Sequence, residues 1–266
     1  MSTFALIHGG GGAGWHWHLV SRRLRGLGHE VIAPDLPCDD DTAGLREYAD
    51  SVITAIGRRK RLVIVGHSYG GFTAPLVAHQ LLVDVLVLVA PMVPSPGEAP
   101  RDYWTNTRHD RAVRKQAARD KGLTGHQDPF VQYYHDVPRK LAERAKRSER
   151  DESVAAYDTP WPLKAWPNVP TRVVLCTEDR LFPADYLRRV VAERLRVVPD
   201  EIVAGHYVML SRAKELAAML NSYAIEYRRP PNRRISRRSV SSRTPSRTTS
   251  SSDADGTRAQ RSRVAR

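Results

Sequence analysis

The chain has only two cysteines, Cys38 and Cys176, among its 266 residues. Two cysteines can form neither a disulfide framework nor a four-cysteine zinc site. No apolar run approaches the roughly 20 residues needed to cross a bilayer, which excludes a transmembrane helix. The amino terminus has no basic segment ahead of an apolar one, so no secretory signal is expected. We therefore expect a cytoplasmic protein without a membrane partner.

Acidic residues are scarce in one part of the chain only. Residues 228–266 hold 12 arginines, no lysine and two aspartates, which places +10 of the formal net charge of +13 in this tail. Large apolar side chains are nearly absent there, so the tail cannot offset its own ordering entropy and is expected to be disordered. A solvated tail without a specific partner is the favoured interpretation. A nucleic-acid contact would be salt-sensitive and independent of base sequence.

Between residues 2 and 227 short apolar runs alternate with segments of helical spacing. The runs at 61–65, 85–90 and 172–176 are rich in β-branched residues and show no polar alternation. Such runs are typical of strands buried on both faces of a parallel sheet. Helical spacing marks 45–56 and 212–225. The alternation predicts the α/β class, with a mostly parallel, doubly wound sheet.

The alternation stops between residues 94 and 169. This stretch has no clear strand, several helical segments rich in arginine and lysine, and prolines at both of its ends. Ligands of open α/β sheets bind at the carboxyl edge of the strands. We therefore predict a core at 1–93 and 170–227, a helical cap at 94–169 over that edge, and the tail at 228–266.

The motif Gly66-His67-Ser68-Tyr69-Gly70 follows a predicted strand and precedes a predicted helix. G-x-S-x-G in that context is a nucleophile elbow, a tight turn that exposes the serine hydroxyl above the sheet. Glycine is needed at its ends because a Cβ would collide with neighbouring backbone. The side chain of His67 should point away from the nucleophile and pack. The alternative for Ser68 is an ordinary helix-capping serine.

A serine hydroxyl needs a general base, which is itself oriented by a third group. In this type of fold the chain order is serine, acid, histidine. Asp179 follows the predicted strand at 172–176, and His206 follows a further one at 201–204. Both loops lie at carboxyl ends of strands, as Ser68 does. We assign Asp179 as the acid, with Glu178 as the alternative, and His206 as the base.

An oxyanion hole needs two backbone N–H donors aimed at the carbonyl oxygen of the substrate. One is expected from Tyr69, the residue after the nucleophile, and the other from the glycine-rich loop after the first strand. Gly10 is the preferred donor in that loop and Gly11 the alternative. The same loop also fits G-x-G-x-x-G, with Asp35 about 20 residues beyond it, which is the fingerprint of a dinucleotide-binding fold. That alternative leaves the elbow and the loops of Asp179 and His206 unexplained.

Together these motifs resemble the compact branch of α/β-hydrolase fold serine esterases that contains plant methylesterases and hydroxynitrile lyases. The motifs are His8-Gly9-Gly10-Gly11, Gly14-Trp15-His16-Trp17, Gly66-His67-Ser68-Tyr69-Gly70-Gly71 and Gly205-His206-Tyr207. The resemblance covers residues 3 to about 224 and is weakest across the cap. It implies a parallel sheet of six strands under a helical cap. It also implies Ser68, Asp179 and His206 as a catalytic triad, with the N–H groups of Gly10 and Tyr69 as the oxyanion hole.

The lyase members of that branch have a lysine after the catalytic histidine and a threonine in the glycine loop. Here these positions correspond to Tyr207 and Gly11, so cyanohydrin cleavage is disfavoured. We expect a serine hydrolase that cleaves a small carboxylic ester without metal or cofactor. The alternatives are lactone hydrolysis, C–C bond hydrolysis or perhydrolysis by the same triad, or ligand binding without catalysis.

The substrate pocket is the least specific part of the prediction. We expect Gly11, Trp104, Tyr133 and Tyr207 to line it, although packing between the cap and the sheet would explain the aromatic residues equally well. Arg180, next to the acid, is expected to be a solvated charge. The sequence leaves the oligomeric state open, with a homodimer as one option.

Overall fold

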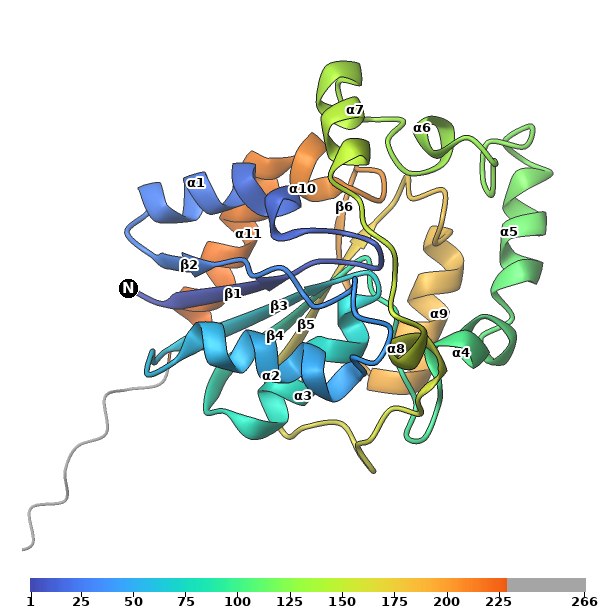
Figure 1. Ribbon diagram of the computed structural model, residues 1–266. Helices are drawn as coiled ribbons and strands as arrows, with labels where there is room; N and C mark the ends of the chain where they lie inside the picture. Colours follow the sequence, from blue (N-terminus) through green and yellow to red (C-terminus); the bar gives the residue numbers. More distant parts are fainter. Residues whose placement is uncertain (229–266) are drawn as a thin grey trace, which may run out of the picture. The chain divides into compact units, whose positions relative to one another are not determined.

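The computed structural model describes residues 1–228 (Figure 1). All but the first residue of the tail predicted at 228–266 lies outside the described residues, so its predicted disorder is untested. Within residues 1–228 no helix combines the length and the hydropathy that a membrane span requires.

Six parallel strands form a single sheet in the order β2-β1-β3-β4-β5-β6. This confirms the predicted parallel sheet of six strands. Gly66, the first glycine of the elbow, pairs with Ile7 at the end of the first strand. The glycine loop and the elbow therefore begin side by side at one edge of the sheet. The strands are β1 (Thr3–Ile7), β2 (Glu30–Ile32), β3 (Leu62–His67), β4 (Val83–Val89), β5 (Thr171–Cys176) and β6 (Asp200–Ile202).

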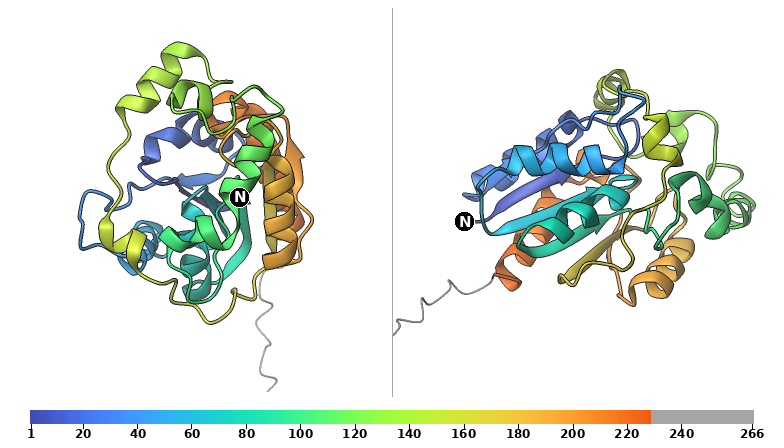
Figure 2. Two further views of the ribbon diagram at one scale, coloured as in Figure 1. Left: turned by 90° about the vertical axis from the view of Figure 1, so that its right-hand side faces the viewer. Right: turned by 60° about the horizontal axis from the view of Figure 1, so that its bottom comes forward.

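Both faces of the sheet are buried at its central strands β1, β3 and β4, which carry apolar residues at most positions. In β4, Leu86 and Leu88 point into one core cluster, whereas Val85 and Val87 point into the other. This two-residue alternation between two apolar faces accounts for the unbroken β-branched runs. The helices α2 (Leu45–Ile56), α3 (Gly70–Gln80) and α9 (Ala184–Leu195) cover the first face, and α1 (His18–Gly26) and α11 (Ala213–Glu226) cover the second (Figure 2).

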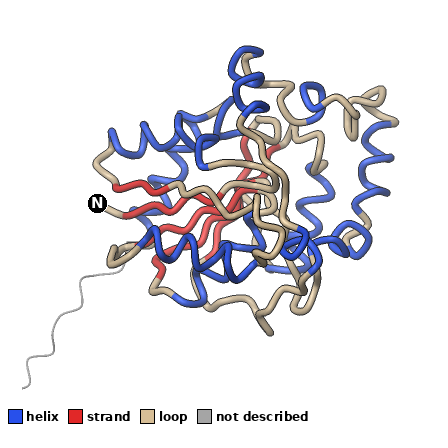
Figure 3. The backbone as a smooth tube through the Cα atoms, in the orientation of Figure 1, coloured by secondary structure: helices blue, strands red, loops and turns tan. Residues whose placement is uncertain are grey.

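The cap lies between β4 and β5 and contains five short helices but no strand among its described residues. Figure 1 places it at the end of the sheet to which the strands run, and Figure 3 shows the connecting loops gathered there. The helices are α4 (Pro100–Asn106), α5 (His109–Ala117), α6 (Pro129–Gln132), α7 (Arg139–Arg147) and α8 (Val154–Asp158). Two further helices of four residues border the same edge, η1 (Gly14–Trp17) and α10 (Val208–Ser211).

Buried aromatic side chains attach the cap to the core. The indole nitrogen of Trp161 donates to the carbonyl oxygen of Phe72 at 3.0 Å. The hydroxyl of Tyr69, in the elbow, donates to the carbonyl oxygen of Ala156 in α8 at 2.7 Å. Large aromatic groups with a satisfied polar atom combine apolar burial with a fixed orientation. The cap is thereby held over the carboxyl ends of the strands.

Candidate active site

Ser68 lies in a strained turn between β3 and α3. Its φ of 50° falls in the left-handed region of backbone conformation, which residues other than glycine rarely adopt. The backbone is fixed there because the N–H of Ser68 donates to Val89 at 3.0 Å and its carbonyl accepts from Met92 at 2.9 Å. A Cβ on Gly66 would lie 2.6 Å from the carbonyl oxygen of Gly70, so glycine is required at this position. These are the features of a nucleophile elbow.

The loops after β5 and β6 bring an aspartate and a histidine to Ser68. The Nε2 atom of His206 lies 3.1 Å from the hydroxyl oxygen of Ser68, and its Nδ1 atom lies 2.7 Å from Oδ2 of Asp179. All three side chains are buried. A carboxylate can only accept a hydrogen bond, so Nδ1 carries the proton and Nε2 is left free to accept the hydroxyl proton.

The acid in contact with His206 is Asp179 and not Glu178. The other oxygen of Asp179 accepts from the N–H groups of Leu181 at 2.8 Å and Phe182 at 3.0 Å. These two donors fix the orientation of the carboxylate. Glu178 is exposed, and its own N–H donates to the carbonyl oxygen of Ala204 at 3.0 Å.

The glycine loop places Gly10 and Gly11 beside the elbow, with different surroundings. The N–H of Gly11 donates to Oε2 of Glu152 at 3.0 Å. Gly11 has a φ of 61°, and a Cβ there would lie 2.9 Å from the carbonyl oxygen of Arg150. Because its N–H is already engaged, Gly11 is a poor oxyanion donor in this arrangement, which favours Gly10. Both Gly10 and Tyr69 line the same cavity as Ser68.

The contacts of the glycine loop explain why it matches the dinucleotide-binding fingerprint. The carboxylate of Asp35 accepts from the N–H of Gly14 at 2.7 Å, so the acidic residue of the fingerprint is bound to the loop itself. A Cβ on Gly14 would lie 2.1 Å from the carbonyl oxygen of Ala33. Gly14 is therefore required for packing against the loop that follows β2. Both Gly14 and Asp35, which belong to the dinucleotide-binding fingerprint, thus have a structural role in the loop.

A cavity of about 310 Å³ opens above Ser68 and His206. Trp104, Tyr133 and Tyr207 lie in its wall, where the sequence places substrate contacts. The ring of Tyr207 is also stacked on that of Tyr134, with centroids 4.4 Å apart. The remaining wall residues, none of which was assigned from the sequence, are Met92, Glu149, Glu152, Tyr157 and Leu181.

Other cap aromatics pack rather than line the cavity. Tyr103, Tyr134 and Trp161 are fully buried in the two core clusters. Arg180 is a correction to the sequence interpretation. It is half-buried and donates to the carbonyl oxygen of Val131 at 2.7 Å, because the cap folds over its loop. His67 packs as expected, and its ring also donates to the backbone carbonyl of His206.

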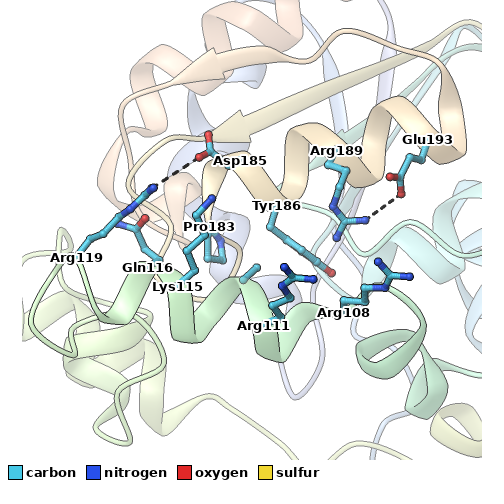
Figure 4. Close-up of a pocket in the computed structure, with 11 residues that line it drawn as sticks. Arg108, Arg111, Lys115, Gln116, Arg119, Pro183, Asp185, Tyr186, Arg189 and Glu193 are labelled. Atoms are coloured by element: carbon cyan, nitrogen blue, oxygen red, sulfur yellow. Dashed lines mark hydrogen bonds and ion pairs between the residues drawn. The ribbon is translucent and has the colours of Figure 1, made fainter.

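A second cavity, of about 390 Å³, lies between α5 and α9 (Figure 4). Two ion pairs cross or flank it, Arg119 with Asp185 at 4.0 Å and Arg189 with Glu193 at 3.0 Å. Arg108, Arg111 and Lys115 add further positive charge to its wall. This cavity is larger than the one above Ser68, but its lining does not include Ser68, Asp179 or His206. Residues 1–228 contain no cluster of three or more histidine, cysteine or acidic side chains arranged to bind a metal ion.

Comparison with known proteins agrees with the fold. Residues 4–219 match the alpha/beta hydrolase family model. Norfluorocurarine synthase 1 of Strychnos sp is 23% identical over 253 residues, which cover 83% of this chain and 94% of the relative. Methylesterase 3 of Arabidopsis thaliana is 24% identical over 260 residues, which cover 84% of this chain and 95% of the relative.

Polyneuridine aldehyde esterase of Rauvolfia serpentina is similar in both sequence and structure. It is 22% identical over 249 residues, which cover 82% of this chain and 93% of the relative. A crystal structure of polyneuridine aldehyde esterase superposes with a TM-score of 0.68 at 22% identity, covering 84% of this chain and 98% of that chain. The structural likeness shows a common fold. Because the family model spans most of its length, this chain belongs to the alpha/beta hydrolase family.

Proposed function

We propose that this protein is a serine hydrolase that cleaves a small carboxylic ester by acyl transfer. The observation that carries the proposal is the buried chain of hydrogen bonds from Asp179 through His206 to Ser68. An esterase and a methylesterase among the relatives support the same reaction class. The tyrosine at position 207, where lyase members have lysine, argues against cyanohydrin cleavage.

In the proposed first step the hydroxyl oxygen of Ser68 attacks the ester carbonyl carbon while Nε2 of His206 takes the proton. The carboxylate of Asp179 stabilises the resulting imidazolium without taking its proton. The N–H groups of Gly10 and Tyr69 donate to the oxyanion. His206 then protonates the leaving alkoxide, which departs as an alcohol and leaves Ser68 acylated.

In the second step water attacks the acyl group by the same route. His206 takes a proton from the water and returns it to Ser68, which releases the carboxylic acid. Every proton is moved by His206, so one correctly oriented imidazole serves both halves of the reaction. Groups already present in the chain supply the nucleophile, the base and the oxyanion donors.

The substitution Ser68→Ala tests the proposal. We expect it to abolish hydrolysis of p-nitrophenyl acetate and covalent labelling by a fluorophosphonate, with circular dichroism and melting temperature close to those of the wild type. Ser222→Ala is the matched control because Ser222 is exposed on α11. Undiminished hydrolysis or labelling in the Ser68 variant would refute the nucleophile. Labelling without turnover of any ester would favour another reaction on the same triad.

A further inference from the structure

A carboxylate from the cap forms part of the wall of the cavity above Ser68. Glu152 accepts from the N–H of Gly11 at 3.0 Å and from the hydroxyl of Tyr48 at 2.5 Å. Its neighbours hold it in place, because the N–H of Arg150 donates to Gly11 at 2.7 Å and the hydroxyl of Ser153 donates to Ala43 at 2.6 Å. The position of the carboxylate is therefore fixed by bonds on both sides of it.

No cation within residues 1–228 forms an ion pair with Glu152. The nearby guanidinium of Arg150 is directed instead at Asp39, 3.1 Å away, and at the carbonyl oxygen of Leu36, 2.8 Å away. Burial raises the pKa of Glu152 above its usual value, and the hydrogen bonds from Tyr48 and Gly11 and the charge of Arg150 offset this only in part. An ionised carboxylate in such a place is incompletely solvated, so a cation that entered the cavity would gain interaction energy there.

The rest of the wall adds a second carboxylate and several aromatic side chains. A second carboxylate, Glu149, lies in it and accepts from the hydroxyl of Tyr134 at 2.6 Å. Lys146 pairs with Glu149 at 2.6 Å and partly neutralises it, but Lys146 is 44% exposed and does not line the cavity. The described lining contains no lysine or arginine. Its aromatic residues are Tyr69, Trp104, Tyr133, Tyr157 and Tyr207. Aromatic faces together with carboxylates favour the binding of an organic ammonium group.

Glu152 also lies close to the expected oxyanion hole. Its Oε2 atom is 3.3 Å from the position that a Cβ on Gly10 would occupy. A negative charge beside Gly10 opposes the negative charge that develops on the substrate carbonyl oxygen. A positive group on the substrate, placed against Glu152, would offset that repulsion in the transition state. It would therefore increase kcat as well as affinity.

From these contacts we propose that the cavity selects esters that carry a protonated or quaternary amine. Glu152 is the principal residue that recognises the cation, and Glu149 and the aromatic wall assist it. The proposal rests on the proposed ester hydrolase function and specifies its substrate class. Esters bearing a carboxylate should be the poorest substrates, because they would place like charges together in a partly desolvated site.

Two esters of nearly equal shape provide the test. Acetylcholine carries a quaternary nitrogen, and 3,3-dimethylbutyl acetate has a neutral quaternary carbon at the same position. We expect kcat/KM, divided by the hydroxide-catalysed rate of each ester, to favour the cation by about tenfold or more in the wild type. A ratio of one or below would overturn the proposal.

Two substitutions test whether Glu152 causes the preference for the cationic ester. Glu152→Gln keeps the size of the side chain and should reduce the preference about tenfold. The ratio of two substrates cancels any general loss of active enzyme. Asp151→Asn is the matched control, because Asp151 is the adjacent carboxylate, is exposed and does not line the cavity. An equal loss in both variants, or an unchanged ratio in Glu152→Gln, would refute the role of Glu152.

A binding measurement separates this proposal from the proposed reaction. Calorimetry on the Ser68→Ala variant compares choline with 3,3-dimethylbutan-1-ol, its neutral analogue, and needs no turnover. Tighter binding of choline, lost in a Ser68→Ala/Glu152→Gln double variant, would support cation recognition even if neither ester were hydrolysed. Equal binding of the two alcohols would refute cation recognition and leave the hydrolase function to stand on the Ser68 test.

Discussion

The Nε2 atom of His67 lies 3.0 Å from the backbone carbonyl oxygen of His206. The residue before the nucleophile therefore supports the loop that carries the base. A carbonyl can only accept, so His67 donates from Nε2. Burial lowers the pKa of His67 well below its usual value, which keeps the ring neutral in this bond. The two imidazole rings are also in contact, with centroids 4.7 Å apart.

We predict that His67→Leu lowers kcat on the order of 10- to 100-fold with a smaller change in KM. The carbonyl of His206 would lose its donor, and the imidazole would no longer be held at the hydroxyl of Ser68. Steady-state kinetics on a chromogenic ester and the rate of fluorophosphonate labelling measure the effect.

His67→Gln provides the test of mechanism, because a glutamine amide can supply the same N–H donor. Partial recovery of kcat in this variant, relative to His67→Leu, is expected. If both variants lost activity equally while their melting temperatures differed, the contribution of His67 would be packing alone.

The fold could be predicted from the sequence because its signals are local. Runs such as Val85–Val89 are apolar at every position and rich in valine, a pattern typical of a strand buried on both faces. The convergence of Asp179 and His206 followed from the rule that parallel strands end at the same edge of a sheet. The structure places both side chains beside Ser68.

The wall of the cavity could not be predicted in the same way. Glu152 meets Gly11 across 141 positions of the chain, and no local pattern reports such a contact. Tyr133, which follows α6, lines the cavity, whereas its neighbour Tyr134 is buried in a core cluster. Arg180 is held by a carbonyl of the cap rather than by solvent. Each of these depends on how the cap folds onto the core.

Asp179→Asn should lower kcat on the order of 10³- to 10⁴-fold. The amide would donate to Nδ1 of His206 and stabilise the tautomer that has its proton on Nε2, so the ring could not accept the proton of Ser68. The melting temperature should change little because the side chain keeps its shape. Glu178→Gln removes the neighbouring exposed carboxylate and should retain wild-type kinetics. The reverse pattern, with the larger loss at Glu178, would show that the acid is wrongly assigned.

Gly66→Ala should destabilise the fold by roughly 1–3 kcal/mol or prevent folding. The added Cβ would lie 2.6 Å from the carbonyl oxygen of Gly70 and 2.7 Å from Cβ of Ala74, both of which are fixed in the elbow. Gly26→Ala is the matched control in α1, where a Cβ would have no neighbour within 4 Å. The control should leave stability unchanged or raise it by about 0.5–1 kcal/mol. Urea unfolding of the two variants compares them, and equal stability would contradict the close packing of the elbow.

Stability should fall between neutral pH and pH 4 because of the buried histidines. Desolvation lowers the pKa of His8 from 6.5 to about 4. In the unfolded chain His8 takes up a proton as the pH falls through 6.5, whereas in the folded protein it stays neutral until about pH 4. The unfolded state binds more protons within this window, so the free energy of unfolding falls as the pH is lowered, by about 3 kcal/mol for this one group.

The substitution His8→Gln isolates that contribution. Glutamine does not titrate, and its carbonyl can still accept from the N–H of Leu36, as Nε2 of His8 does at 3.0 Å. Urea unfolding at pH 7 and pH 4 should therefore show a loss of stability about 3 kcal/mol smaller in this variant than in the wild type. His126→Gln, at an exposed histidine of the cap, should leave the pH dependence unchanged. Glu152, whose pKa is raised, acts in the opposite direction, but it does so equally in all three proteins and cancels from the comparison. If His8→Gln and the wild type lost the same free energy over this range, His8 would have to be protonated at an ordinary pH, and its burial beneath the glycine loop would be wrong.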